Sequence, residues 1–331
     1  QIRATKGRAG ILFKYSDNSR IMNSHQGTHS ATHSGSEHKK SYFGFNYDKH
    51  YKILFLLPAL LLIGSIIYLS VFYANTGDIM HKDVTLTGGT TLTIFDGTVS
   101  LKELESALSS EFSDLSIRAL TDFSSGKTVA ISVETRADQK ELKGAVEKFL
   151  GYSLNEANSS IEFSGSSLSN SFYKQLLVAM LLAFAFMTVT VFIIFRSALP
   201  STYVIFAAFM DIVVTLAIVN IIGLRISTAG IAAFLMLIGY SVETDILLTA
   251  RALKNTEDHF NKRVLGAFKT GMTIMISSIL AFTVAYFAVI SPVLQQVFLI
   301  LVIGLTVDLV ATWCMNASLL KWSDERKHKH H

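Results

Sequence analysis

Four carboxylic acids lie inside long apolar stretches of the sequence, where charged side chains are rare. Asp211, Glu243, Asp245 and Asp308 are each set among aliphatic and aromatic residues. An ionised carboxylate at the centre of a bilayer costs at least ~2.5–3.5 kcal/mol, so such a residue needs a partner, a water-filled cavity or a bound proton. We therefore treat the four acids as candidates for an ion or proton relay inside a membrane.

Hydroxyl and amide side chains follow three of these acids at a spacing of one helical turn. Residues four apart share a face of a helix. The three stripes are Asp211 with Thr215, then Ser241, Asp245 and Thr249, and finally Asp308, Thr312 and Asn316. Burial and nearby charges tune how readily a carboxyl group exchanges its proton, so facing stripes predict a site that moves protons or cations. A static polar cluster that only joins helices would show the same spacing.

Glu243 and Arg251 each allow two interpretations. Glu243 precedes Asp245 by two residues, and Arg251 and Lys254 follow soon after, so these acids could instead lie among the lipid headgroups. Arg251 is six residues past Asp245, which is about 9 Å along a helix. It is a candidate charge partner for an acid, or an anchor at the membrane interface.

The composition indicates a membrane protein. Half of the 331 residues are hydrophobic and 16% are charged, whereas soluble domains are about 25% charged. The single cysteine, Cys314, excludes an internal disulfide and a cysteine-based metal cluster. The sequence shows no phosphate-binding loop and no metal-ligand spacing in the parts expected to fold. We expect no cofactor, no metal, no nucleic-acid partner and no enzymatic activity.

Six apolar stretches are long enough to cross the ~30 Å hydrocarbon core of a bilayer as helices. The expected spans are 51–73, 173–195, 201–222, 226–250, 269–289 and 294–320. Lys and Arg concentrate in residues 1–50, in the Arg196 turn, in 251–269 and in the tail 321–331. The positive-inside rule then predicts a multi-pass protein of the cell membrane with both termini in the cytoplasm.

Residues 74–172 differ from the spans because they are polar and rich in acids. The pattern predicts a strand from Val84 to Phe95 that is interrupted at Gly88-Gly89, a helix opened by Ser100, a β-hairpin, a helix opened by Asp138, and a strand over Ser160–Phe163. The order β-α-β-β-α-β is typical of ferredoxin-like domains. The expected fold class is an α-helical membrane protein with six transmembrane helices and a ferredoxin-like α+β extracytoplasmic domain between the first and second helices.

The N-terminal residues 1–50 are polar and rich in Ser, Thr, Gly and His, which predicts a disordered cytoplasmic tail. His25, His29 and His33 would line up on one face of a helix. The Gly and Ser residues around them favour a loop, so the histidines do not predict a metal site.

Several short motifs add to this layout. They are Thr87-Gly88-Gly89-Thr90, the stretch around Asp211, Gly239-Tyr240-Ser241 with the acids and Arg251 that follow, and the run Asp308–Asn316. Over about residues 45–322 the sequence resembles the SecF family. This family is part of the SecD/SecF proteins, which belong to the RND superfamily. The run Asp308–Asn316 resembles the archaeal branch of the family in particular.

The resemblance implies an auxiliary subunit of Sec-dependent protein export. Its partners would be SecD, the SecYEG channel, the translocating polypeptide and the lipid bilayer. Proton or ion coupling would involve the intramembrane acids, and Gly88, Gly89 and Thr90 would form the motif that opens the extracytoplasmic domain.

Three positions depart from the bacterial pattern of that family. The acid in Glu243-Thr244-Asp245 is displaced by one residue, Thr270–Thr273 lacks an arginine, and Ser164-Gly165-Ser166 lacks the proline of a Gly-Pro motif. Other functions also fit the sequence. A small-solute exporter of the same superfamily would share the layout, an intramembrane aspartyl protease would use Asp211 and Asp245, and a sensor would use the outer domain to bind a ligand.

Overall fold

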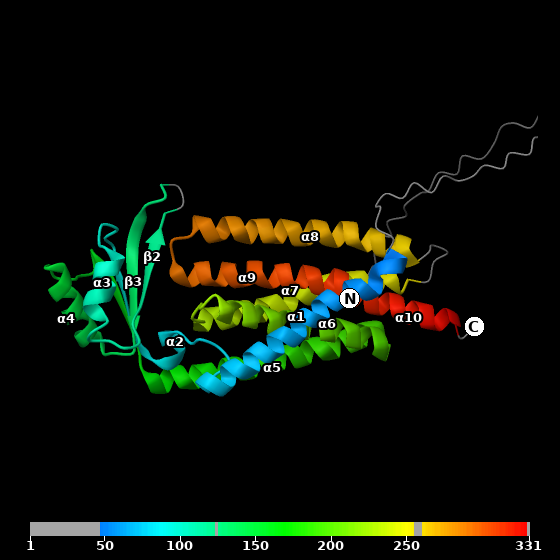
Figure 1. The fold of residues 1–331 in the computed structure, drawn as a ribbon, viewed down its shortest axis with the longest axis horizontal. Helices are drawn as coiled ribbons and strands as arrows, with labels where there is room; N and C mark the ends of the chain where they lie inside the picture. The colour runs from blue at the N-terminus through cyan, green and yellow to red at the C-terminus, as the bar shows by residue number, and fades with distance from the viewer. Residues whose placement is uncertain (1–46, 123–124, 255–259, 330–331) are drawn as a thin grey trace, which may run out of the picture. The chain divides into compact units, whose positions relative to one another are not determined.

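The computed structural model describes residues 47–122, 125–254 and 260–329 (Figure 1). Six helices in this part are long and apolar enough to cross a membrane, as predicted. They are α1 Tyr47–Thr76, α5 Ser166–Phe195, α6 Ala198–Ile221, α7 Thr228–Ala252, α8 Phe260–Ala288 and α9 Pro292–Val310, the last continued by a π-helical turn, Ala311–Asn316, and by α10 Ala317–Lys329. The stretch with His25, His29 and His33 lies outside the described residues.

Short-range signals set several helix ends. Pro292 lies in the first turn of α9, where its missing N–H is not needed. The Ser227 side chain accepts a hydrogen bond from the Gly230 N–H and so caps α7. Arg196 ends α5 in the left-handed conformation, with φ of 49°. Helix α8 begins at Phe260, ahead of the span expected from residue 269, so part of the basic segment 251–269 is helical.

The centre of the bundle is built from the helices that carry the candidate acids. In the most apolar segments of α6, α7 and the α9–α10 span, 56, 56 and 50% of residues are buried, against 11, 6 and 11% for α1, α5 and α8. The outward side chains of α1 and α5 are mainly apolar, for example Ile53, Leu181 and Phe186. Lipid can solvate such a surface, so the structure agrees with a multi-pass membrane protein.

The ferredoxin-like arrangement of the small domain is confirmed. Its elements are β1 Gly89–Ile94, α3 Leu101–Leu108, β2 Ser116–Thr121, β3 Thr128–Thr135, α4 Gln139–Leu150 and β4 Ser159–Ser164. The sheet order is β2-β3-β1-β4 with all pairs antiparallel. Figure 1 shows α3 and α4 together on one face of the sheet, where Leu92, Ile131 and Val133 meet Leu104 and Leu142 in an apolar core.

The first expected strand is only partly correct. Residues Val84–Thr87 form a short helix, α2, and β1 begins at Gly89. Thr87 N–H and Gly88 N–H donate back to the carbonyl oxygens of Asp83 and Val84, so the alternating apolar residues close a helical turn instead of pairing with a strand.

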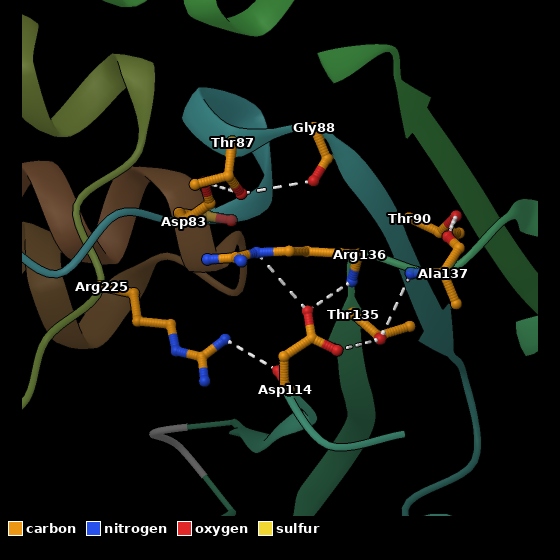
Figure 2. Close-up of polar contacts among 9 residues, drawn as sticks. All are labelled: Asp83, Thr87, Gly88, Thr90, Asp114, Thr135, Arg136, Ala137 and Arg225. Atoms are coloured by element: carbon orange, nitrogen blue, oxygen red, sulfur yellow. Dashed lines mark hydrogen bonds and ion pairs between the residues drawn. The ribbon is translucent and has the colours of Figure 1, made fainter. Parts of the chain in front are cut away.

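The Gly-Gly-Thr motif has a clear steric role. Gly88 and Gly89 have φ of 86° and 143°, which L side chains rarely adopt. A Cβ on Gly88 would lie 2.4 Å from the Cα of Ser166, and one on Gly89 would lie 2.4 Å from the carbonyl oxygen of Thr135. Thr90 Oγ1 then donates to the carbonyl oxygen of Ala137 at 2.8 Å (Figure 2). The motif therefore lets the linker pass tightly between β3 and the start of α5.

Helix α8 packs closely on the π-helical turn through a glycine, which gives a testable prediction. A Cβ on Gly271 would lie 2.4 Å from the Trp313 ring, whereas a Cβ on Gly239 in α7 would meet nothing within 4 Å. Trp313 is held by Phe268 and Met275, so it cannot move easily. We expect Gly271→Ala to lower the free energy of unfolding by about 1–3 kcal/mol through overpacking.

The matched control is Gly239→Ala, which should leave stability unchanged or raise it by up to ~1 kcal/mol, because alanine favours helix over glycine. Thermal unfolding of both purified variants, followed by tryptophan fluorescence, compares them directly. Equal stability of the two variants would contradict the close contact at Trp313.

Candidate functional site

The acids of α6, α7 and α9 meet in the interior of the bundle. Asp211, Asp245 and Asp308 are each 0% exposed. The carboxyl groups of Asp211 and Asp308 are hydrogen-bond partners, and Asp245 interacts electrostatically with both. Three predicted relay residues, far apart in the sequence, thus form one carboxyl cluster.

Hydroxyl groups from α7 and from the π-helical turn bind Asp211 and Asp308. Ser241 Oγ on α7 donates a hydrogen bond to Asp211 Oδ2 on α6. Asp308 accepts one from Thr244 Oγ1 at 3.1 Å and one from Thr312 Oγ1 at 3.0 Å. The cluster therefore ties α6, α7 and α9 together through side chains alone.

The π-helical turn after α9 supplies the contact to Asp245. Asn316 Nδ2 donates to Asp245 Oδ1 at 2.7 Å and lies 3.5 Å from Thr249 Oγ1. Thr312 and Asn316 are both in this turn and both buried. Single π-helical turns inside α-helices occur often at functional sites, and this one carries two ligands of the cluster.

Two polar residues near the cluster do not follow the prediction of which side chains support the acids. Thr244 was not among the predicted residues, yet it donates to Asp308 and to the carbonyl oxygen of Ser241. Its position three residues after Ser241 places it beside the predicted stripe, a signal that could have identified it. Thr215 is buried as expected, but its Oγ1 makes no hydrogen bond to the described residues.

Glu243 does not belong to the cluster, which corrects the prediction that it is a relay residue. Its side chain is exposed on α7, whereas Asp245 is buried. Residues two apart are rotated by about 200° around a helix. Glu243 therefore points away from the interior when Asp245 points toward it.

Arg251 is not the charge partner of an acid in the cluster. Its Nη1 donates to the carbonyl oxygen of Gly266 at 2.5 Å and to Thr270 Oγ1 at 3.1 Å. Arg251 therefore links α7 to the start of α8. Among the described residues, no Lys, Arg or His forms a salt bridge with Asp211, Asp245 or Asp308.

The lack of a nearby base determines what the cluster can do. Adjacent ionised carboxylates in a dry interior repel one another and lose their hydration. Bound protons, or a bound cation, relieve that cost. Within the described residues, Asp211 Oδ1 and Asp245 Oδ2 have no hydrogen-bond partner, so both can take part in such binding.

A second group of buried charges joins the small domain to the bundle and was not predicted. Glu134 on β3 and Asp83 in the linker are 4% and 7% exposed. Burial, reinforced by the charge of Asp83 and opposed by Arg118 and Arg225, raises the pKa of Glu134 to about 7. Burial also raises the pKa of Asp83. Arg225 lies in the α6–α7 turn, so its pairing with these acids needs the tertiary fold.

Backbone contacts reinforce this junction. Asp83 N–H donates to the carbonyl oxygen of Ile226 at 3.0 Å, and Ile226 N–H donates to that of His81 at 2.7 Å. Asn220, at the end of α6, accepts from His81 N–H and donates to the carbonyl oxygen of Ile79. The linker of the small domain is therefore bonded to the turn that connects two of the acid-bearing helices.

Fold and site together define a class: a multi-pass membrane protein with a ferredoxin-like domain between its first two spans and a buried carboxyl cluster. Residues 145–326 match the family described as "Protein export membrane protein SecD/SecF, C-terminal". The chain belongs to the SecD/SecF family, and the predicted resemblance is confirmed.

Similar proteins come from archaea. The protein-export membrane protein SecF of Methanothermobacter thermautotrophicus is 35% identical over 280 residues, which cover 83% of this chain and 93% of that protein. SecF of Methanocaldococcus jannaschii is 32% identical over 294 residues, covering 83% and 96%.

A solved structure has the same fold. The crystal structure of SecDF, a translocon-associated membrane protein from Thermus thermophilus, matches 85% of this chain with a TM-score of 0.65 and 16% sequence identity. The match spans 39% of the SecDF chain, so this chain corresponds to less than half of that protein.

Proposed function

We propose that this protein is an auxiliary subunit of Sec-dependent protein export that acts with SecD at the SecYEG channel. Its termini lie in the cytoplasm, and the small domain lies outside the cell membrane, where it meets the translocating polypeptide. The family assignment supports the export role. The matched family and the fold shared with SecDF, a translocon-associated membrane protein, support SecD as the partner.

The observation that carries the proposed mechanism is the buried carboxyl cluster without a base. Binding or loss of protons at Asp211, Asp245 and Asp308 changes the hydrogen bonds that connect α6, α7 and α9. The α6–α7 turn is bonded to the small domain through Arg225, which donates to the Asp114 carbonyl oxygen, and to the linker of that domain through Ile226. A shift of these helices would therefore move the domain on the outer side of the membrane.

Purification of the intact chain from its native membrane in mild detergent tests the partner assignment. A tag on the chain should recover a SecD protein in a fixed ratio, and the same tag on an unrelated multi-pass protein should not. Recovery of the chain without SecD, in several detergents that preserve its fold, would contradict the proposed role.

A further inference from the structure

A polar cavity of about 250 Å³ lies where the last turn of α1 meets the small domain and the α6–α7 turn. Its lining includes Phe72 and Thr76 of α1, Lys82 of the linker, and Arg136 and Arg225. Pockets for drug-sized ligands measure roughly 300–1,000 Å³. This cavity therefore suits one compact polar group.

Asp114 brings two guanidinium groups to the cavity (Figure 2). Arg136 Nε lies 3.7 Å from Asp114 Oδ2, and Arg225 Nη1 donates to the Asp114 carbonyl oxygen at 3.3 Å. Thr135 Oγ1 and the Arg136 N–H, both at 2.8 Å, hold the Asp114 carboxylate in place. The Arg136 side chain is 68% exposed, and its Nη atoms make no hydrogen bond within the described residues.

The charged groups that line the cavity leave one cation in excess. Lys82, Arg136 and Arg225 face Asp78 and Asp114. Lys82 Nζ pairs with Asp78 at 2.7 Å, and Asp114 is held as described above. A monoanionic ligand would make the lining electrically neutral, and two arginines offer the forked donors that match phosphate oxygens.

Two further carboxyl groups near Arg225, together with Arg118, would offset this excess only when both are ionised. Asp83 and Glu134 interact electrostatically with Arg225 but do not line the cavity. Arg118 pairs with Glu134 at 3.4 Å and also acts on Asp83, so Arg225 is not their sole counter-ion. Burial raises the pKa of both acids, that of Glu134 to about 7, and protonation of either one leaves the excess in place.

The cavity lies next to the ends of two apolar spans. Helix α1 ends at Thr76 and α6 ends at Ile221. Tyr68 and Phe72 stack on α1 with ring centroids 6.2 Å apart, and Phe72 meets the His81 ring edge to face at 4.8 Å. Tyrosine is enriched at the membrane interface, where lipid headgroups lie, and Tyr68 agrees with that depth.

We propose that this cavity binds the phosphodiester headgroup of an anionic membrane lipid through Arg136 and Arg225, with Lys82 at its edge and an acyl chain along Tyr68 and Phe72. The bound lipid would join the small domain to α1 and the α6–α7 turn. The site is independent of the carboxyl cluster and of the role in export.

Native mass spectrometry of the intact purified chain tests the proposal. The protein is incubated with phosphatidylglycerol or with phosphatidylcholine, and the lipid-bound fraction is measured. We expect retention of phosphatidylglycerol over phosphatidylcholine, and a loss of about fivefold in affinity for each of Arg136→Gln and Lys82→Gln, as for removal of one basic contact to an anionic lipid. Lys102→Gln, on the exposed face of α3, should bind as the unchanged protein does.

Three outcomes would overturn the lipid site. The first is equal retention of both lipids, and the second is equal retention of phosphatidylglycerol by the variants and the Lys102→Gln control. The third is competition by inorganic phosphate at the concentration at which phosphatidylglycerol binds, which would assign the cavity to free phosphate. Because Arg136 is mostly exposed, Arg136→Gln should fold, and its elution in size-exclusion chromatography verifies this.

Discussion

Replacement of Asp211 by asparagine should reduce export to the level of membranes that lack the chain. Asparagine keeps the size of the side chain and can still accept the hydrogen bond from Ser241, so the helices should pack as before. It cannot bind or release a proton, and it removes the carboxyl partner of Asp308. The measurement is translocation of a secretory protein into inverted vesicles with an imposed proton gradient.

The matched control for this experiment is Glu243→Gln. It removes a carboxylate from the same bundle, at an exposed site on α7 outside the carboxyl cluster. Export should be unchanged in this variant. Normal export with Asp211→Asn, at normal protein levels in the membrane, would remove the proton-coupling mechanism and leave the family assignment intact.

The second large effect should be a pH dependence of the small domain that is set by Glu134. The pKa of Glu134 is raised from 4.5 to about 7 in the folded protein, chiefly by burial. Between these two values the folded domain holds a proton that the unfolded chain releases. The contribution of Glu134 to the stability of the domain should therefore be largest below pH 4.5 and fall as the pH rises to about 7, by at most ~3 kcal/mol.

Hydrogen exchange of the β1 and β3 amides in the intact protein, corrected for intrinsic rates, measures this change. The raised pKa of Asp83 acts in the same direction, while Arg118 and Arg225 oppose both shifts. Glu134→Gln should remove most of the dependence of amide exchange on pH, and above pH 7 it should slow the exchange of the β1 and β3 amides. An unchanged profile in Glu134→Gln would assign the pH dependence to other groups.

The meeting of the three acids could be predicted from the sequence because it follows from helical geometry. Asp211, Asp245 and Asp308 are each followed by a hydroxyl residue at a spacing of four, and polar faces avoid lipid. The same geometry excludes Glu243, since it lies on the opposite side of α7 from Asp245. That error came from treating nearness in sequence as nearness in space.

Other features depend on contacts that no local pattern contains. The run Ala311–Asn316 has no residue that dictates a π-helical turn, yet the turn presents Asn316 to Asp245. Val84–Thr87 alternates like a strand but closes a helical turn, in which the N–H groups of Thr87 and Gly88 donate to the carbonyl oxygens of Asp83 and Val84. Arg225 meets the small domain only after both parts have folded.

Infrared difference spectroscopy across a pH titration tests most directly whether the buried cluster exchanges protons. The intact protein should show bands of protonated carboxyl groups that weaken as the pH rises. Asp211→Asn, Asp245→Asn and Asp308→Asn should each remove or shift part of that signal, whereas Glu243→Gln should leave it unchanged. Identical spectra from the unchanged protein and the three cluster variants would show that the acids hold the helices together without taking up or releasing a proton.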